Sequence, residues 1–284
     1  MPTERFRKRQ AEIDTLIENA RATYPLHWRN LILEWQSAKQ DAVWLTYAAN
    51  YLFFTAGLRW ALDPFSLYTR IGAAEQPDFA SDLSMLELVV LSHTHNDHLD
   101  PNLIKAISEL PITWVIPEFM LGRVNEITRL HTERVLIPQP GLSLRFGNLT
   151  LTPFQGLHMH AGGGVPEMGY LAEFSGKRWL FPGDTRTFNL SALPHFGKLD
   201  GVFAHLWLGK TQACADRPSQ LENFSQFFAG LGANRIVISH MFEYGRDADD
   251  FWDERHFKMV AECIKEFDAK LKVSPVLMGE RITL

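Results

Sequence analysis

The most informative segment of the chain reads Ser92-His93-Thr94-His95-Asn96-Asp97-His98-Leu99-Asp100. It follows the largely apolar run 86–91, which is typical of a buried strand. Imidazoles so close together repel one another when protonated, and need hydrogen-bond partners when they are buried and neutral. A divalent cation removes both problems, because neutral imidazole is a good metal ligand and the cation compensates the carboxylate. The pattern therefore predicts one loop that serves two metal positions through His93, His95, Asp97 and His98.

Three later segments each place a histidine or an aspartate just after a strand-like run. The run 149–154 leads into Gln155-Gly156-Leu157-His158-Met159-His160, the run 178–182 leads into Gly183-Asp184-Thr185, and the run 234–239 ends at His240. In this order the four segments resemble the His-x-His-x-Asp-His motif and the later ligand loops of the metallo-β-lactamase superfamily. The resemblance covers residues 42–284.

This resemblance implies a mixed α/β (α+β) fold, a four-layer αββα sandwich with metals at one edge of both sheets. The catalytic domain would comprise residues 41–284. The resemblance further implies that His93, His95 and His158 hold one metal, that Asp97, His98 and His240 hold the second, and that Asp184 bridges the two. His160 competes with His158, since it lies two residues away on the same side of a predicted strand; His158 matches the family placement better.

A narrower resemblance lies upstream, in residues 43–52 and 60–65. These residues are similar to the opening of the branch that contains L-ascorbate-6-phosphate lactonase and N-acylphosphatidylethanolamine phospholipase D. Thr46-Tyr47 stands where that branch commonly has Gly-His, which removes one polar group near the site. Asp63 resembles a carboxylate that orients the metal ligands; otherwise it only opens a turn before Pro64.

The implied activity is that of a metal-dependent hydrolase acting on a small ester, lactone or phosphodiester. Two divalent ions, Zn²⁺ first and Mn²⁺ or Fe²⁺ as alternatives, would provide a hydroxide nucleophile, which Asp97 would orient. An iron-dependent redox enzyme of the persulfide dioxygenase type uses a similar fold and is the second hypothesis. A non-catalytic metal-binding protein is the third.

Four further features qualify as substrate contacts. His205 follows a strand beyond Asp184, where it is either a substrate contact or a core histidine. Arg186 and Lys210 are either anion-binding groups or ordinary surface cations, and Gly162-Gly163-Gly164 predicts a mobile loop beside the site.

Composition points to a protein without nucleic-acid or membrane partners. The net charge is −5 over 284 residues, which argues against a dedicated nucleic-acid surface. Apolar runs stay short of the ~20 residues of a membrane span, and the start of the chain lacks the core of a signal peptide. The 2 cysteines, Cys214 and Cys263, are expected to be free thiols. We therefore expect a cytoplasmic protein that acts on a small molecule.

The first forty residues predict a helical extension outside the family core. Apolar residues recur at helical spacing in two stripes, which Pro25 separates. Such helices most often pack on the parent domain; the alternatives are a contact between two copies of the chain and a contact with a membrane surface.

Further elements follow from pattern and caps. Strands are expected at 43–54, 58–62, 86–92, 112–116, 142–156, 167–182 and 199–208. Helices are expected at 102–110 with Asp100 as cap, at 118–130, from a capping box at Ser219–Glu222 to Leu231, and at 249–269.

Overall fold

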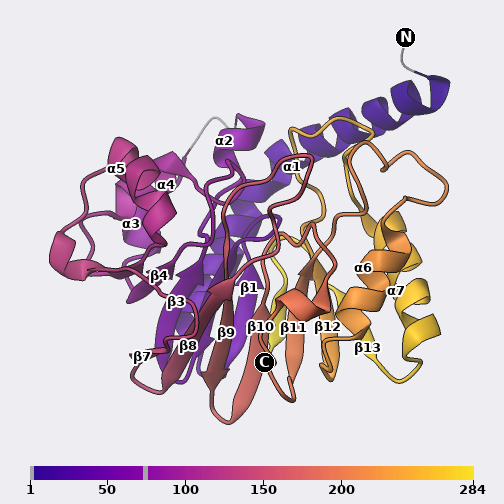
Figure 1. The fold of residues 1–284 in the computed structure, drawn as a ribbon. Helices are drawn as coiled ribbons and strands as arrows, with labels where there is room; N and C mark the ends of the chain where they lie inside the picture. Colours follow the sequence, from indigo (N-terminus) through magenta and orange to yellow (C-terminus); the bar gives the residue numbers. More distant parts are fainter. Residues whose placement is uncertain (1–2, 73–75) are drawn as a thin grey trace.

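The computed structural model describes residues 3–72 and 76–284. Within these ranges the chain forms two seven-stranded sheets, with helices on both outer faces (Figure 1). The predicted mixed α/β sandwich with an N-terminal helix is therefore confirmed.

The first sheet contains the strands that lead into the histidine-rich segment. Its strands pair in an antiparallel way from β14 to β3 and in a parallel way from β3 to β6. In spatial order they are β14 (Arg281–Thr283), β1 (Ala42–Leu45), β2 (Tyr51–Thr55), β3 (Leu58–Leu62), β4 (Leu88–Val90), β5 (Thr113–Val115) and β6 (Val135–Leu136).

The second sheet has the same succession of pairings. It is antiparallel from β7 to β10 and parallel from β10 to β13. In spatial order its strands are β7 (Leu144–Phe146), β8 (Leu149–Gln155), β9 (Met168–Phe174), β10 (Lys177–Phe181), β11 (Gly201–His205), β12 (Arg235–Ser239) and β13 (Lys272–Pro275). Because β8, β10, β11 and β12 run in one direction, the loops that follow them open at the same edge of the sheet.

Alternation along the strands produces three apolar layers. In β10, Trp179 and Phe181 point between the sheets, whereas Leu180 points to the outer face. The inner layer includes a stacked pair, Phe53 and Trp60, whose ring centroids are 3.8 Å apart. Phe181 packs edge-on against Phe53. Aromatic rings thus fix the spacing of the two sheets.

Helices close the two outer faces of the sandwich. The first sheet is covered by α2 (Tyr68–Ile71), α3 (Phe79–Asp82), α4 (Pro101–Ile107), α5 (Leu121–Ile127) and the short 3₁₀ turns η1 (Glu118–Met120) and η2 (Thr132–Arg134). The second sheet is covered by α6 (Leu221–Ala229) and α7 (Glu254–Phe267), with the 3₁₀ turn η3 (Leu190–Ala192) nearby.

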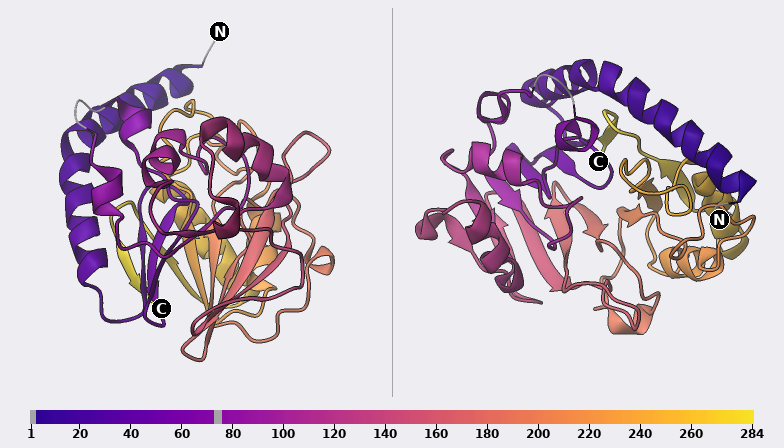
Figure 2. Two further views of the ribbon diagram at one scale, coloured as in Figure 1. Left: turned by 90° about the vertical axis from the view of Figure 1, so that its left-hand side faces the viewer. Right: turned by 90° about the horizontal axis from the view of Figure 1, so that it is seen from above.

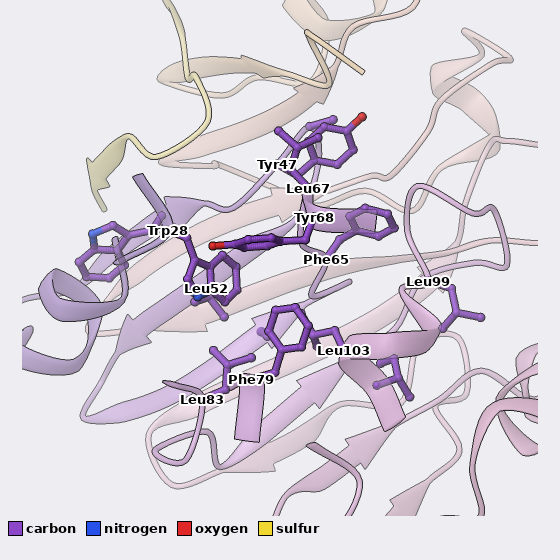
Figure 3. Packing of buried hydrophobic residues seen from close by; sticks show 14 of the residues in the cluster. Trp28, Tyr47, Leu52, Phe65, Leu67, Tyr68, Phe79, Leu83, Leu99 and Leu103 are labelled. Atoms are coloured by element: carbon purple, nitrogen blue, oxygen red, sulfur yellow. The ribbon is translucent and has the colours of Figure 1, made fainter. Parts of the chain in front are cut away.

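The N-terminal extension is one helix, α1 (Glu4–Ser37), which runs along the outside of the molecule (Figure 2). The expected interruption at Pro25 was wrong, whereas the two apolar stripes both lie along the buried face of this one helix. Tyr24 and Trp28, on either side of the proline, are both buried, and Trp28 packs edge-on against Phe79 (Figure 3). Burial of these rings holds the helix together across the one backbone hydrogen bond that Pro25 cannot donate.

The apolar face of α1 is used within the chain. Trp35 Nε1 donates to the backbone oxygen of Phe53 in β2 at 2.9 Å, and Trp28 Nε1 donates to Asp82 Oδ2 at 2.7 Å. The prediction that the extension packs on its own domain is thereby confirmed. No helix in the described ranges has the length and apolar character that crossing a membrane requires. Both cysteines are free, as expected.

Several predicted elements differ from those observed. Residues 142–156 form β7 and β8, and residues 167–182 form β9 and β10. Residues 43–54 form two strands, because Thr46–Asn50 makes a loop in which the Thr46 amide donates to the Asn50 backbone oxygen at 2.8 Å. The capping box at Ser219 is not formed: α6 begins at Leu221, so Gln220 occupies the cap position without a side-chain bond. The region 118–130 is divided into η1 and α5.

The last helix is also shorter than predicted. It begins at Glu254 rather than at 249, because Asp253 caps it by accepting from the Arg255 amide at 3.0 Å. His256 Nδ1 in turn accepts from the Asp253 amide at 3.1 Å, which completes a capping box. Asp100 caps α4 as predicted.

Candidate metal centre

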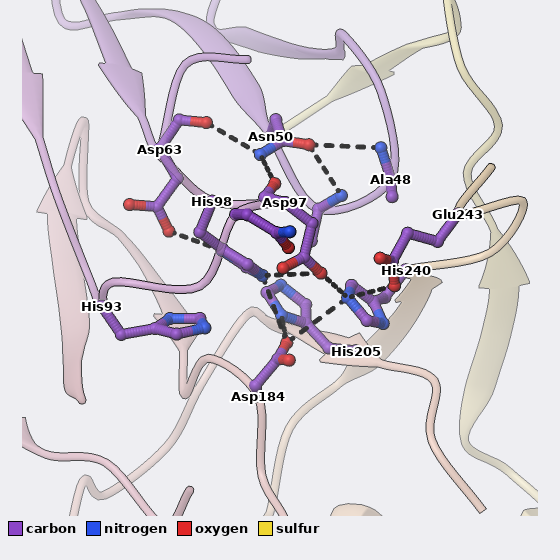
Figure 4. Close-up of polar contacts among 12 residues, drawn as sticks. Ala48, Asn50, Asp63, His93, Asp97, His98, Asp184, His205, His240 and Glu243 are labelled. Carbon is purple, nitrogen blue, oxygen red and sulfur yellow. Dashed lines mark hydrogen bonds and ion pairs between the residues drawn. The ribbon is translucent and has the colours of Figure 1, made fainter. Parts of the chain in front are cut away.

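The histidine-rich segment forms the loop between β4 and α4, at the edge where both sheets end (Figure 1). His93, Asp97 and His98 are buried there, and His95 is half-buried. The loop is braced from behind by Asn50, which donates through Nδ2 to the backbone oxygens of Asp63 and Asp97, both at 2.9 Å (Figure 4). Asn50 lies in the loop after β1, so the break in the predicted strand 43–54 supports the site.

Loops from the second sheet complete two clusters. His158 comes after β8, Asp184 after β10, and His240 after β12. The ligand-type atoms within each cluster lie within 4.8 Å of one another; the first comprises His93, His95, His158 and Asp184, and the second comprises Asp97, His98, Asp184 and His240. Asp184 belongs to both clusters. Every residue predicted as a ligand is therefore brought to this edge, and its role as a ligand stays a prediction.

Asp184 is the shared member because its two oxygens face opposite ways. Oδ1 lies 3.5 Å from His98 Nε2 and 3.8 Å from His240 Nε2. Oδ2 lies 4.0 Å from His158 Nε2. Asp97 approaches the second cluster through Oδ2, 3.2 Å from His240 Nε2. One carboxylate thus reaches both clusters, which is the geometry a bridging ligand needs.

The donor set fits divalent cations. The Nε2 atoms of His93, His98 and His158 are buried and have no hydrogen-bond partner among the described residues. The Nδ1 atoms of His93 and His98 face carboxylates, which leaves their Nε2 lone pairs available. A buried nitrogen without a partner costs about 1–3 kcal/mol, and a cation would remove that cost.

His158 differs in its second nitrogen. Its Nδ1 accepts a hydrogen bond from the Val165 amide at 3.1 Å, so a neutral ring carries its proton on Nε2. Binding of a cation through Nε2 therefore requires this contact with the 162–165 loop to change.

Charges within the centre set the protonation of its members. Burial, reinforced by His93, lowers the pKa of His95 to about 4, and burial lowers the pKa of His158 to about 3. Burial alone would raise the pKa of Asp184, but His240, Arg186 and His98 hold it well below its usual range. At neutral pH His95 and His158 are therefore neutral imidazoles and Asp184 is an ionised carboxylate, the forms that bind metal.

Two carboxylates orient the ligands from outside. Asp63 Oδ2 lies 2.9 Å from His98 Nδ1 and accepts from the hydroxyl of Ser92, so Asp63 occupies the orienting position that the resemblance implied. Glu167 Oε1 lies 3.1 Å from His93 Nδ1 and accepts from the Asp184 amide at 2.8 Å.

Sequence reasoning missed Glu167. A single glutamate before a strand belongs to no recognisable motif. The only sign of its position is indirect and comes from two glycines that pack against it. A Cβ at Gly156 or Gly183 would come within 2.7 Å or 2.3 Å of the Glu167 side chain, so two glycines make room for it.

His205 and His160 occupy different places. His205 is buried at the end of β11, with Nδ1 2.8 Å from Asp184 Oδ1 and Nε2 3.1 Å from the Tyr51 hydroxyl. His160 is exposed, and its Nδ1 lies 3.2 Å from the His158 backbone oxygen. β8 ends at Gln155, before His158 and His160. These two residues are therefore not in the strand that was expected to place both side chains on the same side. The structure puts His158 into a cluster and leaves His160 outside both.

Tyr47, at the Gly-His departure, supplies no ligand. It stacks on Phe65, and its hydroxyl donates to the Tyr244 backbone oxygen at 3.1 Å.

Comparison with known families agrees with this geometry. A family model described as a β-lactamase superfamily domain matches residues 65–241, which include every residue of both clusters. The chain belongs to the metallo-β-lactamase superfamily. The narrower branch suggested by residues 43–65 stays a prediction. None of the curated proteins matches the sequence.

Solved structures share the fold at low identity. The metallo-β-lactamase fold protein YhfI from Bacillus subtilis has a TM-score of 0.62 at 14% identity, covering 86% of this chain and 99% of that one. A possible metal-dependent hydrolase from Veillonella parvula has a TM-score of 0.59 at 20% identity, covering 87% and 100%. CmlA, a diiron β-hydroxylase from Streptomyces venezuelae, has a TM-score of 0.62 at 15% identity, covering 87% of this chain and 54% of that one.

Proposed function

We propose that this chain is a metal-dependent hydrolase that cleaves a small ester, lactone or phosphodiester with a hydroxide held between two divalent ions. The observation that carries the proposal is Asp184, whose oxygens reach two clusters of imidazole and carboxylate groups. His93, His95 and His158 would hold one ion, Asp97, His98 and His240 the other, and Asp184 both.

The bound ions would lower the pKa of a water molecule from about 15.7 toward ~7 and polarise the bond to be cleaved. The chain's own groups would do the rest. Asp97 is ionised, because the hydrogen bond from His240 and the charge of His98 outweigh burial and keep its pKa well below the usual range. It can therefore accept a hydrogen bond from the attacking water and orient it. Asp63 and Glu167 would hold the imidazole rings of His98 and His93 in the orientation that metal binding requires.

Zn²⁺ is the expected metal, because the clusters are rich in imidazole, and the two aspartates leave Mn²⁺ and Fe²⁺ as alternatives. A redox function is the second candidate, since a diiron β-hydroxylase shares the fold. A non-catalytic metal-binding protein is the third.

One experiment separates these functions. Metals are quantified in protein purified without added metal, and protein reloaded with Zn²⁺, Mn²⁺ or Fe²⁺ is assayed on phosphodiester, lactone and ester substrates. Hydrolysis that requires about two ions per chain is the expected result. Stoichiometric iron with oxygen uptake and no hydrolysis would overturn it in favour of a redox enzyme. Metal binding without either reaction would favour a binding protein.

We further propose a cytoplasmic location, with residues 1–40 as an extension of the catalytic domain 41–284. Two free thiols and the absence of a membrane-spanning helix among the described residues are consistent with this location. Self-association through α1 is tested by sedimentation of the intact chain.

A further inference from the structure

We propose that Arg186 forms an anion-binding subsite beside the metal centre, so that the substrate carries a phosphoryl or carboxylate group next to the bond that is cleaved. This inference rests on the proposed hydrolase function and narrows its substrates to anionic ones.

The backbone fixes Arg186 at the centre. The residue follows Gly183-Asp184-Thr185 directly, and its amide donates to the Leu157 backbone oxygen at 2.8 Å. Leu157 immediately precedes His158, so one hydrogen bond ties together two loops that carry proposed ligands. The side chain is only 6% exposed, although a guanidinium is normally found in water.

Half of the guanidinium has a partner and half has none. Nη2 donates to Asp184 Oδ2 at 2.7 Å. The guanidinium carbon lies 4.7 Å from the ring centre of Trp207, in a cation–π contact. Nη1 is buried and has no hydrogen-bond partner among the described residues. An ion pair with Asp184 alone would not need a second nitrogen that is buried and unsatisfied.

The free nitrogen lies on the side of the first cluster. Nη2 contacts Asp184 Oδ2, the oxygen 4.0 Å from His158 Nε2, whereas Oδ1 faces His205 and His240. Nη1 shares a carbon with Nη2, so it lies near the same oxygen. Ligation and the arginine contact are compatible, because each carboxylate oxygen has two lone pairs.

Solvent reaches the centre on this same side. His95 is half-buried, and its ring lies 4.7 Å from that of His158. Residues 159–164, which follow His158 in the chain, are exposed. The ring of His160 lies 6.3 Å from that of Trp207, which places His160 beside the subsite rather than in a cluster. A substrate that enters here would pass His160 and Trp207 before it meets Arg186.

Charge explains which ligand fits. A guanidinium is repelled by two divalent cations beside it, and the single charge of Asp184 offsets only part of that repulsion. The planar fork of arginine matches two oxygens of a phosphoryl or carboxylate group, and it is held flat by the Trp207 ring. A neutral substrate would add no further negative charge beside the guanidinium, whereas an anionic one would also give Nη1 an acceptor.

The test uses metal-loaded protein and three variants. Arg186→Gln removes the charge, Arg186→Lys keeps the charge without the fork, and Arg217→Gln removes an equally charged group whose side chain is 63% exposed. Metal content is measured for each variant. Dissociation constants for inorganic phosphate and acetate are measured by calorimetry, and KM and kcat are measured for a phosphodiester and a neutral ester.

We expect Arg186→Gln to weaken phosphate binding at least tenfold and to raise KM for the phosphodiester similarly. At equal metal occupancy, its kcat/KM should fall at least tenfold more on the phosphodiester than on the neutral ester. Arg186→Lys should recover part of the affinity, and Arg217→Gln should match the parent. A larger effect on acetate than on phosphate would assign a carboxylate instead of a phosphoryl group.

Affinities for phosphate and for acetate that both stay within twofold of the parent in Arg186→Gln would overturn the subsite. If that variant loses metal, Arg186→Lys decides, because it keeps a charge beside Asp184: unchanged phosphate affinity with metals bound rejects the subsite, and weaker affinity supports it. Arginine-dependent phosphate binding without any hydrolysis would reject the proposed function alone. Hydrolysis with arginine-independent phosphate binding would reject the subsite alone.

Discussion

Asp184 is the residue on which the two clusters depend. We predict that Asp184→Ala abolishes hydrolysis and lowers metal content to one ion per chain or fewer. Without a shared carboxylate, two divalent ions a few Å apart would repel strongly, since even two unit charges at 4 Å cost about 4 kcal/mol at an effective dielectric constant of ~20. Metal analysis after gel filtration measures this, with Asp216→Ala as the control, because that side chain is 92% exposed. Two ions retained by Asp184→Ala would contradict the bridging role.

Variants of His158 and His160 distinguish a metal ligand from a residue at the entrance to the centre. We expect His158→Ala to lose metal and to lose activity on every substrate. His160→Ala should keep its metals and change only KM or substrate preference, because its ring is exposed and lies outside both clusters. Metal titration of both variants at one pH distinguishes them. Full metal retention by His158→Ala would reject the assignment.

Glu167 is expected to act through His93 and the Asp184 loop. Glu167→Ala leaves His93 Nδ1 and the Asp184 amide without their carboxylate partner. Loss of such an orienting group typically weakens metal binding about 10–100-fold, and we predict an effect of that size. Competition with a chromophoric chelator measures it. Glu173→Ala, which removes a partly exposed partner of Arg178, should leave metal affinity unchanged.

At the scale of single residues, the sequence predicted correctly which residues lie together where these residues form a motif. The spacing of His93, His95, Asp97 and His98 predicted one loop, and the structure places all four at one edge. Glu167 escaped, because its importance comes from burial and from neighbours that lie far away along the chain. Arg186 was named as either an anion-binding group or a surface cation, and the sequence did not show that its side chain is buried. No pattern along the chain encodes the burial of either residue.

Among the elements, α1 is joined to α7 by a buried ion pair. Arg9 contacts Asp253, and their side chains are 8% and 9% exposed. We predict that Arg9→Ala lowers the free energy of unfolding by about 3 kcal/mol at pH 7, because it leaves a buried carboxylate with fewer partners. Arg5→Ala, which breaks an exposed pair with Asp216, should cost less than ~1 kcal/mol. Urea denaturation measures both.

Acid should reduce the effect of Arg9. Burial would raise the pKa of Asp253, but the hydrogen bond and charge of His256 and the charge of Arg9 hold it below its ordinary value. A carboxyl group with a depressed pKa stabilises the fold above its unfolded pKa of about 3.9. That stability is lost progressively as pH falls from the unfolded pKa towards the depressed folded pKa, so the difference between the parent and Arg9→Ala should shrink as pH falls from 5 to 2. A difference that is constant with pH would contradict this account.

Element boundaries were predicted less well than element types. Local signals placed Asp100 at the start of α4, because a cap and a proline act on adjacent residues. The start of α7 and the unbroken course of α1 depend on Asp253 and on the packing of Tyr24 and Trp28. Those are tertiary contacts, and they override local preference.

At the scale of the whole molecule, metal binding should stabilise the fold. The proposed ligands are buried, so an ion binds them fully only in the native chain. Free metal at about 1,000 times the dissociation constant adds about 4.1 kcal/mol. We therefore predict that a chelator lowers Tm and that added Zn²⁺ restores it. Calorimetric scans of the parent and of Asp184→Ala test this, and equal shifts in both would argue against binding at the centre.

The position of the centre across the two sheets has a mechanical consequence. His93, His95, Asp97 and His98 are carried by the first sheet, and His158, Asp184 and His240 by the second. Binding of an ion by both groups of ligands would depend on the relative position of the two sheets, because a displacement of one sheet against the other would move the ligand atoms apart. The relative position of the sheets is fixed inside the sandwich by the packing of Phe53, Trp60 and Phe181. Smaller side chains at these three positions would therefore weaken binding of the ion, although none of the three residues is a proposed ligand.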